Sequence, residues 1–204
     1  MTIEIRKLRK KDYRKVIRFA DAGMHADWFW KRQWAQEAYG RYFFYNEMNH
    51  ATQILAAYEG DRVVGVLLAQ MRGEKKKHQN RWEMLYVKCY ESVQNFFLKK
   101  GSGEYGRTAQ WQRKHTLRTQ KPDGEILFFA ADPNAGMHGI GSALLKELEK
   151  REKGKTIFVL TDSACTWQFY EHRGFECLDE KDIIMNMRTG KIPLRCFVYS
   201  KKMG

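Results

Sequence analysis

A glycine-rich segment between two apolar stretches is the part of the sequence best suited to binding a charged ligand. It reads Asp132-Pro133-Asn134-Ala135-Gly136-Met137-His138-Gly139-Ile140-Gly141-Ser142. The apolar run before it predicts a buried strand, and apolar residues at helical spacing after it predict a helix that opens at the loop. Backbone N–H groups at a helix start lack intrahelical partners and carry the positive end of the helix dipole. The segment therefore predicts an anion site, with phosphate as its natural ligand.

Two familiar phosphate motifs do not match this loop. The dinucleotide fingerprint G-x-G-x-x-G fails because Gly139 and Gly141 are followed by Leu144 where the third glycine should stand. The P-loop pattern fails because Ser142 replaces the lysine that reaches the phosphates. A glycine-rich turn without a ligand remains an open alternative at this point, so other residues must decide.

A second motif downstream, Phe169-Tyr170-Glu171-His172-Arg173-Gly174-Phe175, completes a family resemblance. With the glycine loop, it resembles the GNAT family of N-acetyltransferases. That family has Pro, then Arg or Gln, two residues, Gly, any residue and Gly leading into a helix, and later an aromatic-Tyr-x-x-x-Gly-Phe element. The chain departs from the pattern at two positions, with Gly136 in place of Arg or Gln and Ser163 in place of a frequent Asn.

The resemblance implies a mixed α/β (α+β) fold, with helices on both faces of a central sheet, and acetyl-CoA as co-substrate without a metal. The pyrophosphate would be bound by backbone N–H groups, the pantetheine would pair like an extra strand, and Ser163 would add a polar contact. The implied cofactor-binding residues are Phe129, Ala130, Ala131, Met137, His138, Gly139, Ile140, Gly141, Ser142 and Ser163.

Two side chains are candidates for proton transfer. A neutral amine is needed to attack a thioester. Glu125 begins the buried strand, fourteen residues before Gly139, a register that resembles that of the base in histone-acetylating members, so it is the first candidate for the base, acting through a water. An exposed strand-end carboxylate without a role is the alternative, and His25 and His138 are further candidates. Tyr170 is the candidate general acid, because the leaving thiolate's parent pKa lies in the broad range of tyrosine's, about 10. Simple packing on the sheet is its alternative interpretation.

The expected activity is therefore transfer of an acetyl group from acetyl-CoA to a primary amine of a small molecule or peptide, by direct transfer. The aromatic stretch 28–45 and a basic rim suggest an amino-acid or peptide derivative, or a protein N-terminus, as acceptor. An acyl-CoA-binding regulator without transfer is a second hypothesis, because a fold does not determine function.

The positive charge motivates a third hypothesis. The chain has 204 residues and a formal net charge of +13, of which residues 72–120 supply +8. Lys75-Lys76-Lys77, Lys99-Lys100 and Arg113-Lys114 lie near aromatic residues, a composition that suits nucleic acid or a ribosome. We expect this segment to be a basic, largely helical insertion between the third and fourth strands of one domain that spans residues 1–204.

Periodicity predicts the elements that must position these residues. We expect an amphipathic helix over 82–97 that Gly101 and Gly103 end, and no clear period from there to Gln120. The strand, helix and strand over residues 126–160 form a βαβ unit, which implies parallel strands. The other expected elements are a strand over 3–8, helices from 12, over 28–48 and over 167–172, a hairpin of 53–59 and 62–71, and strands 177–187 and 192–201 joined through Thr189-Gly190.

The remaining composition points to a location in the cytoplasm. The longest apolar run is seven residues, Val63 to Ala69, against about 20 needed to span a membrane. The N-terminus lacks the apolar core of a secretory signal. The spacing of the four cysteines matches neither a disulfide framework nor a zinc site, which suggests reduced core thiols. A homodimer is left open as a partner.

Overall fold

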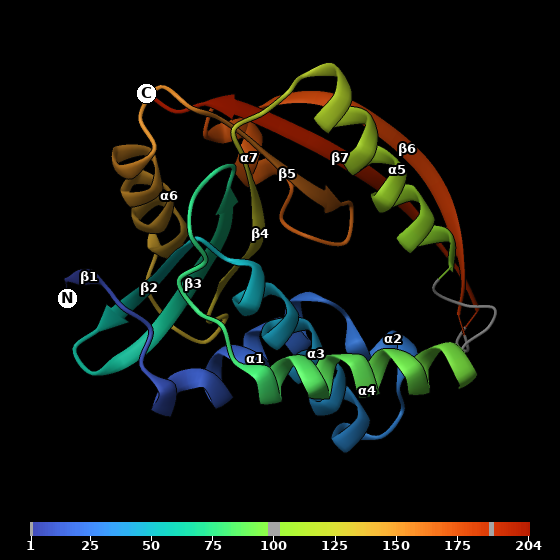
Figure 1. Ribbon diagram of the computed structural model, residues 1–204. Coiled ribbons are helices and arrows are strands. Elements are labelled where there is room, and N and C mark those ends of the chain that lie inside the picture. Colours follow the sequence, from blue (N-terminus) through green and yellow to red (C-terminus); the bar gives the residue numbers. More distant parts are fainter. Residues whose placement is uncertain (1, 98–102, 188–189) are drawn as a thin grey trace.

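The computed structural model describes residues 2–97, 103–187 and 190–204 and has one mixed sheet with helices on both faces (Figure 1). The seven strands of the described residues follow the order β1-β2-β3-β4-β5-β7-β6. Neighbours pair antiparallel except for β4 and β5, which are parallel, so the predicted βαβ unit is confirmed. The strands are β1 (Ile3–Arg6), β2 (Gln53–Glu59), β3 (Arg62–Met71), β4 (Gly124–Ala131), β5 (Thr156–Asp162), β6 (Glu176–Met187) and β7 (Gly190–Lys202).

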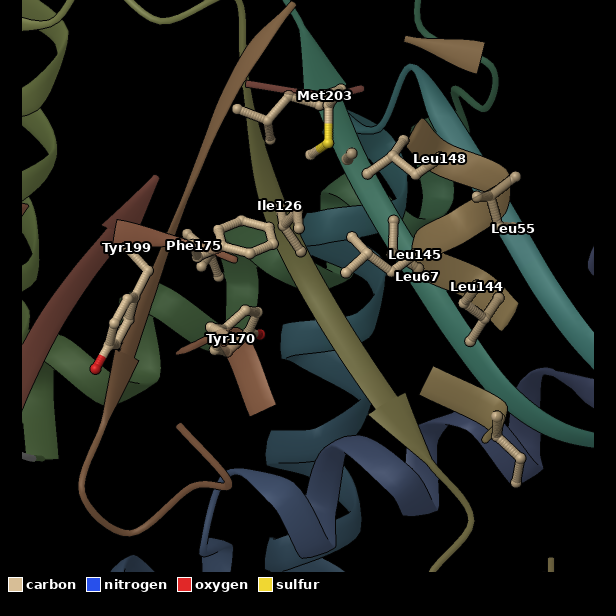
Figure 2. Close-up of a cluster of buried hydrophobic side chains, with 14 of the residues drawn as sticks. Leu55, Leu67, Ile126, Leu144, Leu145, Leu148, Tyr170, Phe175, Tyr199 and Met203 are labelled. Carbon is tan, nitrogen blue, oxygen red and sulfur yellow. The ribbon is translucent and has the colours of Figure 1, made fainter. Parts of the chain in front are cut away.

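The helices divide between the two faces of the sheet. Those of the described residues are η1 (Lys10–Asp12), α1 (Tyr13–Gly23), α2 (Ala26–Phe29), α3 (Gln33–His50), α4 (Arg81–Phe97), α5 (Gly103–Thr119), α6 (Ile140–Arg151) and α7 (Gln168–His172). One apolar core joins α6 and α7 to the sheet, and Figure 2 shows Leu144, Leu145 and Leu148 of α6 beside Leu55 and Leu67. A second core lies between the opposite face and helices α1 and α3.

The segment between β3 and β4 differs from the expectation in one respect. Gly103 begins helix α5 rather than ending a helix, and the stretch to Gln120 that shows no apolar period is helical to Thr119. The reason is that the buried face of α5 is polar: Thr108, Gln112 and Thr116 are each at most 3% exposed. Hydrophobic periodicity cannot detect a helix that buries hydroxyl and amide groups. Gly101, the other expected helix end, lies outside the described residues.

Polar contacts attach α5 to the far half of the sheet. The Gln112 amide donates to Asp179 of β6 at 3.0 Å, and the Tyr105 hydroxyl donates to Asp162 at the end of β5 at 3.0 Å. Helix α4 instead packs beside α3, and Tyr86 donates to the carbonyl of Ala38 at 3.0 Å. The two helices of residues 72–120 thus lie against different parts of the molecule (Figure 1).

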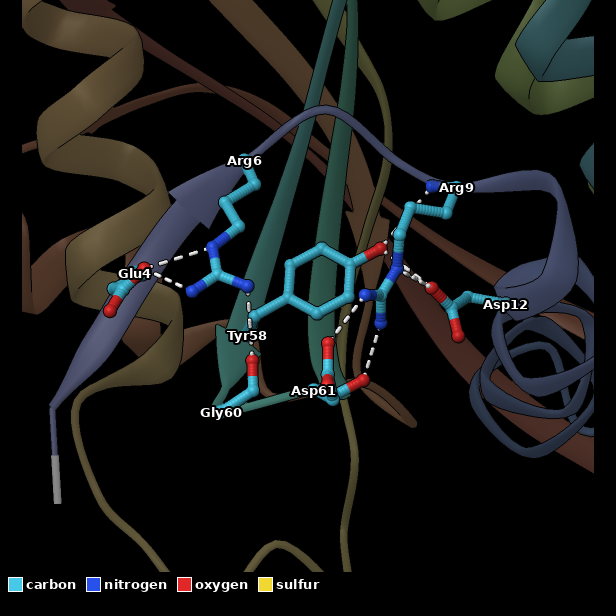
Figure 3. A network of polar contacts seen from close by, with 7 residues as sticks. All are labelled: Glu4, Arg6, Arg9, Asp12, Tyr58, Gly60 and Asp61. Carbon is cyan, nitrogen blue, oxygen red and sulfur yellow. Dashed lines mark hydrogen bonds and ion pairs between the residues drawn. The ribbon is translucent and has the colours of Figure 1, made fainter.

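A network at the N-terminal end of the chain fixes the start of α1 (Figure 3). The Tyr58 hydroxyl donates to Asp12 at 2.8 Å, and the Arg9 guanidinium bonds to Asp12 at 2.8 Å and to Asp61 at 2.7 Å. Arg9 also stacks on the Tyr58 ring, 4.5 Å from its centre. These contacts tie α1 to the β2–β3 hairpin, and Lys15 of α1 in turn pairs with Asp132 at the start of the glycine loop.

The cysteines only partly fit the expectation. All four are free, but Cys196 alone is buried, whereas Cys165 is half-buried and Cys89 and Cys177 are exposed. The expectation that all four are core thiols is therefore wrong, because Cys89 lies on the outer side of α4 and Cys177 on the edge strand β6. Within the described residues, no helix is both long and apolar enough to cross a membrane.

Candidate active site

Strands β4 and β5 separate partway along their length, which leaves a free backbone edge. They pair at only three positions, from Gly124 opposite Ile157 to Ile126 opposite Val159. Just beyond, β4 carries a bulge at Leu127, because Leu68 and Ala69 of β3 face Phe128 and Ile126. A bulge bends its strand and increases the local twist. In the described part of the chain, no strand pairs with the β5-facing edge of residues 127–131.

The predicted contact residues Phe129, Ala130 and Ala131 lie on this free edge. The Phe129 ring packs against Phe169 and Tyr170 of α7, at 5.4 and 6.4 Å between ring centres. Backbone polar groups at such an edge need a partner, from water or from a ligand. An extended chain with amide groups would supply one, so the edge fits the strand-like pairing that the sequence predicts.

The glycine loop presents a row of free donors at the carboxyl end of β4. For the N–H groups of residues 137–142 the described residues provide no acceptor, since the first helical bond of α6 runs from Ala143 to Gly139. Gly136 and Gly139 have positive φ angles of 64° and 86°, which suit glycine. A Cβ on Gly139 would meet no atom within 4 Å, so the space before the helix is open. The loop therefore has the geometry of an anion cradle.

Three contacts hold this loop in place. Lys15 of α1 pairs with Asp132 at 2.9 Å, and the N–H of Asn134 donates to the same carboxylate at 3.0 Å. Although burial opposes its charge, these hydrogen bonds hold the pKa of Asp132 below its ordinary value. Arg62 donates to the carbonyl of Ala135 at 3.2 Å. The cradle is thus anchored from α1 and from β3.

Close packing positions the first turn of α6. A Cβ on Gly141 would lie 3.2 Å from the Phe169 ring, and a Cβ on Gly65 of β3 would lie only 2.5 Å from Cγ2 of Ile140. Both glycines allow the helix start to approach the sheet and α7 closely. Arg173, just after α7, donates to the Ser142 hydroxyl at 2.5 Å. This guanidinium brings a positive charge to the cradle, which has Gly136 where the family usually has Arg or Gln.

Tyr170 lies in an aromatic cluster between α7 and the sheet. Its ring is 8% exposed and packs against Phe175 and Tyr199, with centres 5.4 and 6.0 Å away (Figure 2). Burial, and to a lesser extent the nearby thiol of Cys165, raises the pKa of Tyr170 well above its ordinary value. The phenol is therefore protonated near neutral pH, as a general acid must be. Its role stays a prediction.

The other predicted residues lie at different places around the fork. The Ser163 hydroxyl accepts a hydrogen bond from the Arg195 N–H at 3.0 Å, and Ser163 lines a groove of about 960 Å³ along β7. The Ser163 hydroxyl is thus hydrogen-bonded to the backbone of β7, and its contact with a cofactor stays a prediction. His138 is exposed in the loop, whereas Nε2 of His25 lies 3.2 Å from the Ala164 carbonyl oxygen.

Glu125 is buried at the root of the fork and is paired with a cation. Its Oε1 accepts two hydrogen bonds from Arg113 of α5, at 2.7 and 2.9 Å. Burial raises the pKa of Glu125, while Arg113 opposes the rise through its charge and hydrogen bonds. The candidate base is therefore a buried carboxylate whose Oε1 is hydrogen-bonded to a guanidinium, and its role stays a prediction.

A second carboxylate, Glu47 of α3, faces the same region and was not predicted from the sequence. Its Oε1 accepts a hydrogen bond from the Asn46 amide at 3.0 Å, and Arg113 and Glu125 act on it through space. Burial raises its pKa from 4.5 to about 7, and Glu125 adds to the rise. Nothing in the local sequence distinguishes it from other glutamates on helices, because the charges that act on it, those of Glu125 and Arg113, come from β4 and α5.

The chain is similar to known proteins in its structure rather than in its sequence. Neither the models of known families nor the curated proteins give a match. Among solved structures, the polyamine N-acetyltransferase of Drosophila melanogaster superposes with a TM-score of 0.62 at 12% identity, covering 98% of this chain and 100% of that one. An N-acetyltransferase from Staphylococcus aureus gives 0.57 at 16% identity, with both chains fully covered.

A third structure was determined with a ligand. The PaiA N-acetyltransferase of Thermoplasma acidophilum, in complex with coenzyme A, gives a TM-score of 0.52 at 17% identity, covering 99% of each chain. At these sequence identities, the comparisons show a shared fold and nothing more specific. Together with the forked β4–β5 pair and the glycine loop before α6, they confirm the predicted architecture: the chain has the fold of the GNAT N-acetyltransferases.

Proposed function

We propose that the protein transfers an acetyl group from acetyl-CoA directly to a primary amine of a small molecule or peptide. The proposal is carried by two neighbouring sets of backbone groups that can bind a ligand, one on the edge of β4 and one in the glycine loop that follows it. The edge of residues 127–131 leads to the N–H groups of residues 137–142, and neither set has a partner among the residues that the structure describes. A ligand with an amide-containing arm and a diphosphate matches both sets in that order.

Acetyl-CoA would supply an activated acyl group as a thioester, and the chain would bind it mainly through its backbone. The N–H groups of residues 137–142 would hold the diphosphate, with Arg173 adding a positive charge beside Ser142. The β4 edge at Phe129, Ala130 and Ala131 would pair with the pantetheine arm. This pairing would direct the thioester along β4 toward the root of the fork, where Glu125 lies, past the ring of Tyr170, which packs against Phe129 of the same strand.

The chemistry then needs a proton acceptor, a stabilised oxyanion and a proton donor. A backbone N–H of the β4 edge is suited to the oxyanion that forms when the amine attacks the carbonyl carbon. Tyr170, protonated because it is buried, is suited to give its proton to the departing sulfur.

Two of the structural relatives act on cationic amines according to their names, a polyamine N-acetyltransferase and an agmatine N-acetyltransferase. Agmatine and spermidine are therefore the first acceptors to test here, followed by peptides with a free N-terminus. Acetylation of any of these amines would separate an enzyme from an acyl-CoA-binding regulator, which would bind acetyl-CoA and release no product.

Calorimetric titration of acetyl-CoA into a Gly139→Glu variant tests the cradle. The added carboxylate would occupy the open space before α6 and repel the diphosphate, so binding should become undetectable. Gly154→Glu is the matched control, since Gly154 has a φ of 82° and equally open surroundings. Both variants carry the same backbone strain, of about 1–2 kcal/mol. Retained affinity in Gly139→Glu, with the control unchanged, would refute the cradle.

A further inference from the structure

We propose that Glu47 of α3, rather than Glu125, accepts the proton of the acceptor ammonium, and that Arg113 is a positioning residue that holds Glu125 in place. The inference rests on the proposed acetyl transfer and names a further catalytic residue for it. It follows from the position of Glu47 opposite the fork, from the hydrogen bonds between Glu125 and Arg113, and from the charges that face both carboxylates.

Two sets of contacts place Glu47 above the root of the fork. One turn before it on α3, Phe43 packs edge-on against Phe128 of β4, 5.4 Å between ring centres. Just after α3, the N–H of Thr52 donates to the carbonyl of Ala69, a β3 residue that pairs with Ile126. Helix α3 therefore runs back along β4, from beyond the bulge toward the strand's beginning. Glu47, between these two anchors, lies over the segment that contains Glu125.

Glu125 is poorly suited to take the proton. Arg113 holds Oε1 with two hydrogen bonds, and these bonds and its charge oppose the rise that burial gives the pKa of Glu125. An acceptor ammonium at Glu125 would also approach the guanidinium, which carries the same charge. The pair is better suited to fixing α5 against β4 and to shaping the wall of the site.

Glu47 differs from Glu125 in its hydrogen-bond donor. The groups that act on it are the Asn46 amide, the charge of Arg113 and the charge of Glu125, so its hydrogen bond comes from a neutral donor. Its side chain is part-buried rather than enclosed, which leaves a route for a ligand. A carboxylate that is largely desolvated and lacks a bonded cation attracts an ammonium and binds a proton near neutral pH.

The proton balance is complete with the residues present. Glu47 takes one proton from the ammonium, and the neutral nitrogen attacks the thioester carbon, so that a C–N bond forms and the carbonyl pair moves to oxygen. The C–S bond then breaks with its electrons on sulfur, and Tyr170 protonates the thiolate. Tyr170 regains a proton from the new amide nitrogen, which keeps one hydrogen. Glu47 releases its proton to water, so the net products are the amide, free coenzyme A and one proton.

The test compares turnover of agmatine, spermidine and a peptide with a free N-terminus by wild type, Glu47→Gln and Glu125→Gln from pH 5.5 to 9. Glu37→Gln is the matched control, because Glu37 is an exposed residue of the same helix. Calorimetry with acetyl-CoA checks that each variant retains its cofactor affinity. The ¹³C resonance of the Glu47 carboxyl group, identified by its loss in Glu47→Gln, reports its protonation directly.

We expect Glu47→Gln to lower kcat by about 100- to 10,000-fold and to abolish the acidic limb of the kcat/KM profile. The Glu125→Gln variant should lose some turnover and keep that limb. If Glu47→Gln keeps the limb and Glu125→Gln loses it, Glu125 is the base and the inference is overturned. Absence of turnover in the wild type with every amine, despite acetyl-CoA binding, would instead overturn the proposed function and this inference with it.

Discussion

Glu47→Gln should make the protein more stable at pH 8, even though it removes the inferred base. Folding transfers the Glu47 carboxylate from water into a largely desolvated place, which raises its pKa from 4.5 to about 7. The native state therefore binds this proton more tightly than the unfolded chain, and stability is lost as the pH rises. Glutamine has the same shape, keeps an oxygen for the Asn46 amide and carries no charge, so it avoids this cost.

The size of the effect follows from the two pKa values. The raised pKa of Glu47 lowers the free energy of unfolding by about 3 kcal/mol at pH 8, about 2 kcal/mol at pH 6 and less than about 0.5 kcal/mol at pH 4. For a chain of 204 residues, 1 kcal/mol corresponds to roughly 2–4 °C in Tm. We therefore expect Glu47→Gln to melt about 6–12 °C above the wild type at pH 8, with the difference vanishing toward pH 4.

Thermal melts by differential scanning calorimetry at pH 4, 6 and 8 measure this difference. Glu37→Gln again serves as the control, because the exposed Glu37 gains no comparable relief when its charge is removed. A Glu47→Gln variant that is destabilised equally at all three pH values would show that the carboxylate makes a favourable contact in the native state. That result would refute the reasoning on which its high proton affinity rests.

Two further changes test the donor side of the site. Tyr170→Phe should lower kcat by about 100-fold or more, because it removes the proton that the phenol would donate. Acetyl-CoA affinity should stay nearly unchanged, because the aromatic packing is kept. Steady-state or stopped-flow turnover equal to that of the wild type would show that Tyr170 is not the general acid. Gly65→Ala should cost about 1–3 kcal/mol in urea unfolding and weaken acetyl-CoA binding, because its Cβ would press on Ile140 at the start of α6. Gly106→Ala on α5, where a Cβ meets nothing within 4 Å, should show neither effect.

Local patterns in the sequence predict much of the fold. The hairpin of β2 and β3 has the predicted bounds, because the apolar runs on both sides of Gly60-Asp61 mark the two strands and the turn in the local sequence. The strand, loop and helix around the glycine segment were predicted for the same reason, since buried strand, positive-φ glycines and helical periodicity are all local signals. The candidate anion site could thus be located before any contact was known.

Helix α5 shows where local patterns fail. Its buried residues Thr108, Gln112 and Thr116 are polar, and the amide of Gln112 donates to acceptors on β6 and β7. Those acceptors lie more than 60 residues further along the chain, so no window of sequence contains both partners. A buried polar helix face is therefore invisible to apolar periodicity and becomes evident only in the packed molecule.

Local sequence patterns predicted the candidate anion cradle, the order of most elements and the aromatic motif around Tyr170, because each depends on neighbouring residues. Only the packed molecule shows which of the two carboxylates is paired with a cation among the residues that the structure describes. Arg113 reaches Glu125 from α5, and α3 brings Glu47 over β4, so the ion pair and the unpaired acid result from three elements distant in sequence. A proton affinity depends on desolvation and on nearby charges, and both exist only after folding.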